Sequence, residues 1–174
     1  PGHGTKPGDM LDVTFDKWYD ETAFQLQQFM QEVDKVYAGG FSTGANLTTL
    51  LAIHNDDIEG LMLFSPAFQS RFFISKLAPY IDGLLPWPNV EEEDNPTRYN
   101  STAMQGFGAY QESVNALQKA FTAGPINTPV MMVVAAQDSV VDTQRVAEQF
   151  RDNFVASKKC LIWQGTQPTF LNTP

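Results

Sequence analysis

The chain has 174 residues, of which 20 are acidic and 11 basic, giving a formal net charge of −9. This length suits one domain with a sizeable core. The acidic balance argues against nucleic acids and anionic membrane surfaces as partners, and we interpret it as a source of solubility. No run of 18 or more apolar residues occurs. We therefore expect no stable membrane insertion and a cytoplasmic location.

The N-terminal residues 1–8 carry only the Pro and Gly signals of a turn. We expect a loop whose preceding strand lies outside this sequence. Residues 14–33 are predicted to form an amphipathic helix, capped by Thr14 or Asp12. Its apolar stripe comprises Phe15, Trp18, Thr22, Leu26, Phe29, Met30 and Val33.

Residues 36–44 indicate a short apolar strand that runs directly into the pattern Gly-Phe-Ser-Thr-Gly, centred on Ser42. Residues 45–55 follow with the spacing of a helix. A strand, a tight turn with Ser at its apex and a helix are the context of a nucleophile elbow. Gly40 and Gly44 would leave room where strand and helix come close. The alternative is a Gly-rich turn whose Ser only caps the helix.

Two further apolar runs, residues 58–64 and 129–136, predict strands buried on both faces. A helix over 143–154 and a last strand over 160–163 follow. The alternation of strands and helices predicts an α/β protein with a parallel, doubly wound sheet. Cys160 is the single cysteine, and its apolar strand favours a buried, inert thiol.

The stretch 67–127 is too long for a simple connection between strands. It holds five prolines, many aromatic residues and an acidic run at 91–94 that we interpret as a solvated turn. We expect at least one helix, around 111–121, and interpret the stretch as an excursion from the sheet that covers another part of the protein.

A Ser nucleophile needs a base, usually a His oriented by a buried carboxylate. Asp138 follows an apolar parallel strand by two residues, which places it at the sheet edge where Ser42 lies. Asp142 competes, but it precedes the helix over 143–154 and an N-cap role explains it fully. A turn Asp that bonds its own loop remains the alternative for Asp138.

The chain contains only two histidines, His3 and His54. His54 lies twelve residues beyond Ser42 on one helix, about 18 Å away and out of reach. His3 could lie near the site, but the order His, Ser, Asp differs from the order Ser, Asp, His of elbow enzymes. We therefore expect the base outside this sequence.

The chain resembles the α/β-hydrolase fold enzymes, and within them bacterial carboxylesterases and monoacylglycerol-lipase-like enzymes. Three segments carry the resemblance: Pro1-Gly2-His3-Gly4, the elbow Gly40–Gly44, and the acid loop Gln137–Val141. It implies a hydrolase core over 1–66 and 128–174 and a mostly helical cap, or lid, over 67–127. It also implies an interior portion of a longer enzyme, since the early strands and the catalytic His loop are not matched.

By this resemblance Ser42 attacks a carboxylic ester, the Thr43 N–H supplies half of the oxyanion hole, and Asp138 orients the missing His. Phe41 would line the substrate pocket. Lid aromatics would suit an apolar acyl group, unless they form the lid's own core: Phe68, Phe72, Phe73, Tyr80 and Trp87. We expect no cofactor and no metal. Remaining polypeptide or a second chain is needed to complete the sheet, whose elbow strand would otherwise expose its edge.

Other functions stay open. A Ser nucleophile disfavours the dehalogenases and epoxide hydrolases of the fold, whereas thioesterases, peptidases and carbon–carbon hydrolases remain possible. A second class is a binding module that keeps the fold without the triad. A nucleotide-binding domain would need a phosphate loop, and neither glycine-rich phosphate motif occurs in the sequence.

Overall fold

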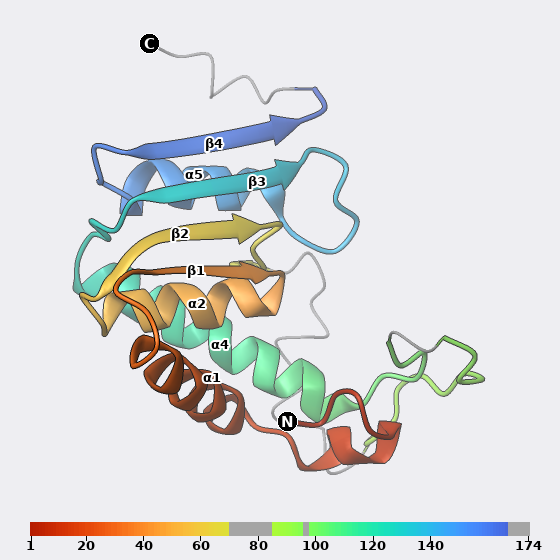
Figure 1. Ribbon diagram of the computed structural model, residues 1–174. Coiled ribbons are helices and arrows are strands. Elements are labelled where there is room, and N and C mark those ends of the chain that lie inside the picture. Colours follow the sequence, from red (N-terminus) through yellow and green to blue (C-terminus); the bar gives the residue numbers. More distant parts are fainter. Residues whose placement is uncertain (70–84, 96–97, 167–174) are drawn as a thin grey trace. The chain divides into compact units, whose positions relative to one another are not determined.

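The computed structural model describes residues 1–69, 85–95 and 98–166. Within them, four strands form one parallel sheet in the order β1-β2-β3-β4 (Figure 1). The predicted α/β class with a parallel sheet is confirmed. The elements in chain order are η1 (Pro7–Asp12), α1 (Phe15–Met30), β1 (Val36–Phe41), α2 (Thr43–Ile53), β2 (Ile58–Phe64), α4 (Met104–Ala123), β3 (Val130–Ala135), α5 (Thr143–Asn153) and β4 (Lys159–Gln164).

The chain divides into two compact units. The N-terminal unit comprises residues 1–27 and 72–113, and the sheet unit comprises 28–71 and 114–174. All four strands, α2 and α5 lie in the sheet unit, whereas α1 and α4 each contribute to both. The predicted division into a hydrolase core and a cap over 67–127 stays a prediction.

The sheet unit is built on apolar strands that alternate with helices. α2 and α5 both lie on one face of the sheet (Figure 1). Every residue of α2 from Ala45 to Ala52 is buried, including two threonines. Their hydroxyls donate back to carbonyls of the preceding turn, Thr48 to Gly44 at 2.8 Å and Thr49 to Ala45 at 2.7 Å. A helix without a polar face can therefore sit in the core with its hydroxyls bonded.

An aromatic cluster forms part of this core. Phe68 is fully buried and stacks on Phe154 at 6.2 Å between ring centroids, while Phe121 meets it edge-on at 5.7 Å. Phe68 was expected to line an acyl pocket or to belong to a lid core. It packs against Phe121 of α4, which also belongs to the stretch 67–127, and against Phe154 at the end of α5, where ring burial stabilises the sheet unit. Phe72, Phe73 and Tyr80 lie outside the described residues.

The sheet face opposite α2 is uncovered in the described part of the chain. Successive side chains of a strand point to opposite faces, and in β1 and β2 the set that faces away from the helices is exposed. The exposed set is apolar and includes Tyr37, Phe41, Met62, Phe64 and Ile162. Exposed apolar patches of this kind are typical of interaction or ligand-binding surfaces.

Cys160 belongs to this uncovered face. The prediction of a buried thiol is wrong, because Cys160 is exposed. The apolar strand around it suggested burial, but β4 is an edge strand, and only Leu161 and Trp163 of its central residues are partly covered. Apolar composition alone did not tell a central strand from an edge.

Two helical segments differ from the sequence prediction. α4 begins at Met104, seven residues before the predicted start at Gln111. Gly106 and Gly108 lie in its first two turns and lower the helix propensity there, so the pattern was visible only further along. A short 3-10 helix, η1, covers Pro7–Asp12, where no element was predicted.

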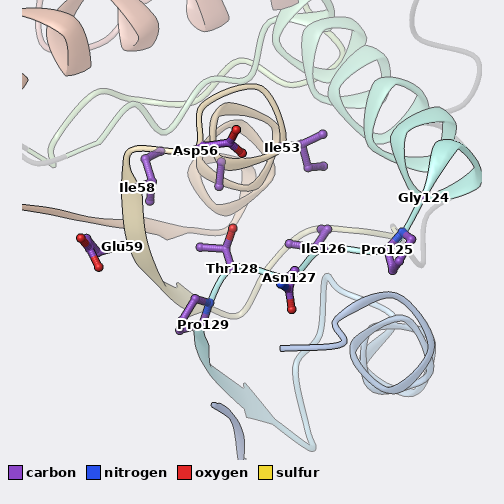
Figure 2. Close-up of a pocket in the computed structure, with 11 residues that line it drawn as sticks. Ile53, Asp56, Ile58, Glu59, Gly124, Pro125, Ile126, Asn127, Thr128 and Pro129 are labelled. Atoms are coloured by element: carbon purple, nitrogen blue, oxygen red, sulfur yellow. The ribbon is translucent and has the colours of Figure 1, made fainter. Parts of the chain in front are cut away.

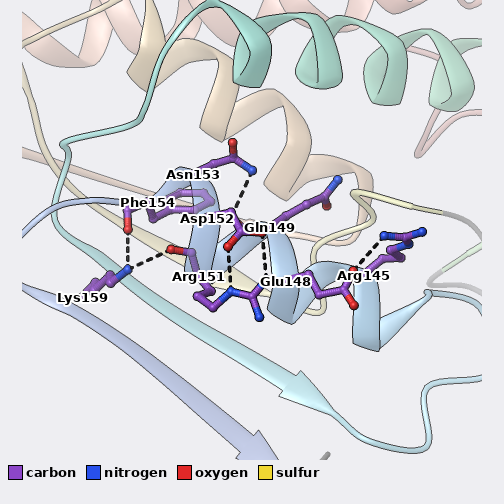
Figure 3. A network of polar contacts seen from close by, with 8 residues as sticks. All are labelled: Arg145, Glu148, Gln149, Arg151, Asp152, Asn153, Phe154 and Lys159. Carbon is purple, nitrogen blue, oxygen red and sulfur yellow. Dashed lines mark hydrogen bonds and ion pairs between the residues drawn. The ribbon is translucent and has the colours of Figure 1, made fainter. Parts of the chain in front are cut away.

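Polar contacts run along α5 and reach Lys159 at the start of β4 (Figure 3). Arg145 pairs with Glu148 at 2.9 Å and Arg151 with Asp152 at 2.6 Å, both on the surface. Hydrogen bonding from Arg151 lowers the pKa of Asp152. Lys159 differs from these pairs, because its ammonium donates to the carbonyl of Phe154 at 2.5 Å and lies 5.2 Å from the centre of the Phe150 ring.

Replacing Lys159 with methionine is expected to lower the free energy of unfolding by about 1 kcal/mol. The change removes a cation from the C-terminal carbonyls of α5 and from the aromatic face, while the methionine keeps most of the aliphatic stem. Urea denaturation of the full-length protein measures the effect. Lys158→Met is the matched control and should change stability by less than half as much; an equal loss in both variants would contradict this role for Lys159.

Candidate active site

Ser42 lies between the end of β1 and the start of α2, in a backbone conformation that side chains rarely adopt. Its φ is +55° and its ψ −122°, and the side chain makes no capping hydrogen bond. A Ser that only capped the helix would bond an N–H of the first turn. The strained backbone instead holds a half-buried hydroxyl at the apex of the turn. Such strain is typical of functional positions.

Gly40 allows this turn to close. A Cβ at Gly40 would lie 2.4 Å from both the carbonyl carbon and the oxygen of Gly44, which is backbone that cannot move aside. The predicted reason for this glycine, close approach of strand and helix, therefore holds. A Cβ at Gly44 would meet no atom within 4 Å, so steric crowding does not require a glycine at this position.

Both backbone polar groups of Ser42 are bonded to the chain that leaves β2. The Ser42 N–H donates to the Phe64 carbonyl at 3.0 Å, and the Ser42 carbonyl accepts from the Ala67 N–H at 3.2 Å. Ser65 also has a positive φ, +40°, and its N–H donates to Val133 on β3 at 2.8 Å. We call residues 65–69 the β2-exit segment; it fixes the elbow from the neighbouring strand.

Asp138 lies in the loop after β3. One carboxylate oxygen, Oδ1, accepts from the N–H groups of Val140 at 2.8 Å and Val141 at 2.9 Å. The turn role considered for this residue is thus present. Within the described part of the chain the other oxygen, Oδ2, accepts no hydrogen bond, so the half-buried carboxylate keeps an acceptor for a further partner.

Asp142 is the N-cap of α5. Its side chain accepts from the Arg145 N–H at 3.2 Å, as expected for a capping residue. Its own N–H donates to Gln69 at 2.9 Å, at the end of the β2-exit segment. Capping accounts for the position of its carboxylate.

Ser42 and Asp138 lie at the same edge of the sheet. β1 and β3 are parallel and separated only by β2, and both residues follow the carboxyl ends of their strands. Neighbouring strands are about 4.8 Å apart, so these two strand ends are about 10 Å apart. An imidazole with a hydrogen bond on each ring nitrogen spans such a gap when both side chains reach inward.

The two histidines belong to different units of the chain. His54 is the C-cap of α2, at the end of the helix opposite Ser42, and its side chain is exposed. This agrees with the expectation that it is out of reach. His3 belongs to the N-terminal unit, where its ring is stacked on Tyr99 at 6.4 Å and tilted against Trp18 at 5.7 Å.

Thr43 and Phe41 flank the nucleophile position. Thr43 is the first residue of α2, so its N–H has no acceptor within the helix and points toward the turn. This suits an oxyanion donor. Phe41 is the last residue of β1, and 71% of its surface is exposed on the uncovered sheet face. Its assignment to a substrate pocket stays a prediction.

A cavity of about 480 Å³ lies at the other edge of the sheet, around the N-terminal ends of β2 and β3 (Figure 2). Its wall includes Asp56 and Glu59 but no Ser, Cys or His. Glu59 already pairs with Lys35 at 3.9 Å. This cavity is therefore not part of the site at Ser42.

Two other site types find no support among the residues that the structure describes. They contain no group of three or more His, Cys, Asp or Glu side chains placed to hold a metal ion. None of their helices is long and apolar enough to cross a membrane.

The parallel sheet, the strained serine between strand and helix, and the aspartate loop at the same edge define an α/β-hydrolase core. The profile of the serine hydrolase family FSH1 matches residues 15–166, and the chain therefore belongs to this family of serine hydrolases. A search of curated protein sequences finds no match.

Solved structures share the fold. One, described with the metagenome-derived lipolytic enzymes LipS and LipT, aligns with a TM-score of 0.79 and 19% identity over 94% of this chain and 69% of its own. The Paleococcus ferrophilus monoacylglycerol lipase aligns with a TM-score of 0.65 and 15% identity, over 83% of this chain and 64% of its own. The Saccharomyces cerevisiae monoglyceride lipase aligns with a TM-score of 0.64 and 13% identity, over 86% of this chain and 59% of its own. The chain thus spans about two thirds of the length of these proteins, and the predicted α/β-hydrolase fold is confirmed.

One residue that supports the elbow was not predicted. Asn46 is fully buried on α2 and donates from Nδ2 to the Ala67 carbonyl at 2.9 Å. A signal was present in the sequence, because residues 45–53 leave no polar face on the helix, and an asparagine there must be buried and hydrogen-bonded.

Proposed function

We propose that the protein is a serine hydrolase of carboxylic esters that works through an acyl-enzyme on Ser42. Asp138 acts as the triad acid, and a histidine from polypeptide outside these 174 residues acts as the base. The observation that carries the proposal is the strained backbone of Ser42 at the turn between β1 and α2, with a hydroxyl not used for capping. Membership of a serine hydrolase family supports it.

The chemistry follows from this arrangement. The histidine takes the proton of the Ser42 hydroxyl as Oγ attacks the ester carbonyl, and the tetrahedral oxyanion receives the N–H of Thr43. The histidine returns the proton to the departing alcohol, which leaves an acyl-Ser42 ester. Water, deprotonated by the same histidine, then releases the acid and restores the enzyme. Asp138 orients the imidazole and stabilises its protonated form.

The substrate class is proposed from separate observations. Solved relatives of the fold include a monoacylglycerol lipase and a monoglyceride lipase. We propose a small ester with an apolar acyl group. The uncovered apolar sheet face supports the further proposal that remaining polypeptide, or a second chain, packs against β1 and β2.

A fluorophosphonate probe tests the reaction class. The reagent forms a stable covalent adduct with a serine only when a base activates its hydroxyl. We expect full-length protein to be labelled at Ser42, as located by peptide mass spectrometry, and to hydrolyse p-nitrophenyl esters. Excess ester should slow labelling by competition. Labelling at another residue would move the nucleophile away from Ser42, whereas no labelling together with no hydrolysis would favour a binding module that keeps only the fold.

A further inference from the structure

Asn46 is a buried amide in the second turn of α2, four residues after Ser42. It is fully buried, and its Nδ2 donates at 2.9 Å to the carbonyl of Ala67, 21 positions further along the chain. On the same helix, the Thr49 hydroxyl bonds the Ala45 carbonyl of its own turn, whereas the Thr48 hydroxyl bonds Gly44 and also the Gly39 carbonyl of β1 at 3.3 Å. Asn46 thus directs a side-chain bond from α2 to the chain that leaves β2.

The acceptor of this bond lies in a segment that holds the nucleophile. The N–H of Ala67 donates to the Ser42 carbonyl at 3.2 Å, and the Ser42 N–H donates to Phe64 at 3.0 Å. Ser42 has an unfavourable φ of +55°. A strained residue keeps such a conformation only where its surroundings over-determine it. Ala67 supplies one of those constraints, and Asn46 fixes the peptide on the other side of Ala67.

We infer that Asn46 is a positioning residue for the Ser42 nucleophile, acting through the Ala67 peptide. This inference rests on the proposed function of Ser42. Asn46 clamps the β2-exit segment against α2. The Ser42 carbonyl then keeps the Ala67 N–H as a donor beside the Ala45 N–H of its own helix, and the hydroxyl stays aimed at the substrate. Without the amide, the Ala67 carbonyl loses a buried donor and the segment shifts to find another. A displacement of about 1 Å at a nucleophile can cost about 100-fold in rate.

The variant Asn46→Leu, which keeps the size of the side chain and removes its polar atoms, tests this role in the full-length protein. We expect kcat for a p-nitrophenyl ester and the rate of fluorophosphonate labelling to fall by about 10- to 100-fold. KM should change less than about twofold, because Asn46 touches no substrate. If Asn46→Leu does not fold, Asn46→Ala carries the same expectation, since it also removes the donor.

Thr49→Val is the matched control. Thr49 is as deeply buried on the same helix, but its hydroxyl bonds only Ala45 within α2. We expect it to lose thermal stability while kcat and the labelling rate stay within about twofold of the wild type. A purely structural role for Asn46 would make the two residues behave alike. Wild-type rates in either folded Asn46 variant would overturn the inference.

The proposed function and this inference can fail separately. If the wild-type protein is not labelled at Ser42, the proposed function fails. If it is labelled at Ser42 and a folded Asn46 variant reacts as fast, only the positioning role of Asn46 fails.

Discussion

Replacing Ser42 with alanine is expected to lower ester hydrolysis by at least about 10³-fold and to abolish fluorophosphonate labelling. The hydroxyl is the atom that forms the acyl bond, and no neighbouring group can replace it at the apex of the turn. The Cβ is retained, so the variant meets the same steric conditions at φ +55° as the wild type. Its melting temperature should therefore stay close to that of the wild type, and kcat should report the chemistry alone.

Ser157→Ala provides the control for this measurement. Ser157 is exposed in the loop between α5 and β4 and has no contact with the elbow. Its rates should match those of the wild type. Hydrolysis by folded Ser42→Ala at the wild-type rate would show that Ser42 is not the nucleophile, whatever the backbone geometry suggests.

The sequence carried enough information for the sheet and the elbow because both depend on local patterns. Apolar runs identified β2 and β3, and the glycine-flanked Ser42 predicted the turn between β1 and α2. Each of these signals lies within a few residues of the element it predicts. The steric need for Gly40 is local as well, since the atoms it avoids belong to Gly44 and Ala45.

What the sequence did not show depends on contacts between distant residues. The exposure of Cys160 follows from the position of β4 at the sheet edge, which no pattern within β4 records. Phe68 was placed in a lid because it belongs to the stretch 67–127, and no local pattern shows that it stacks on Phe154 outside that stretch. The bond from the Asn46 amide to the Ala67 carbonyl joins positions 21 residues apart, which no pattern around either residue records. These three features can be recognised only once the fold is known.

Asp138 and Asp142 offer the second decisive comparison, because the same substitution has different consequences at the two positions. Asp138→Asn keeps an oxygen that can accept the N–H bonds of Val140 and Val141, so the loop should hold its shape. It removes the negative charge that would orient the histidine and stabilise it when protonated. We expect kcat to fall by about 10²- to 10⁴-fold, with little change in melting temperature.

Asp142→Asn should behave differently. Asparagine caps helices as well as aspartate does, so stability should hold, and kcat should stay within about threefold of the wild type. Steady-state kinetics of both variants, together with their thermal melts, give the comparison. A larger loss of kcat in Asp142→Asn than in Asp138→Asn would identify Asp142, the helix cap, as the triad acid. Equal small losses would show that neither aspartate is the carboxylate partner of the catalytic base.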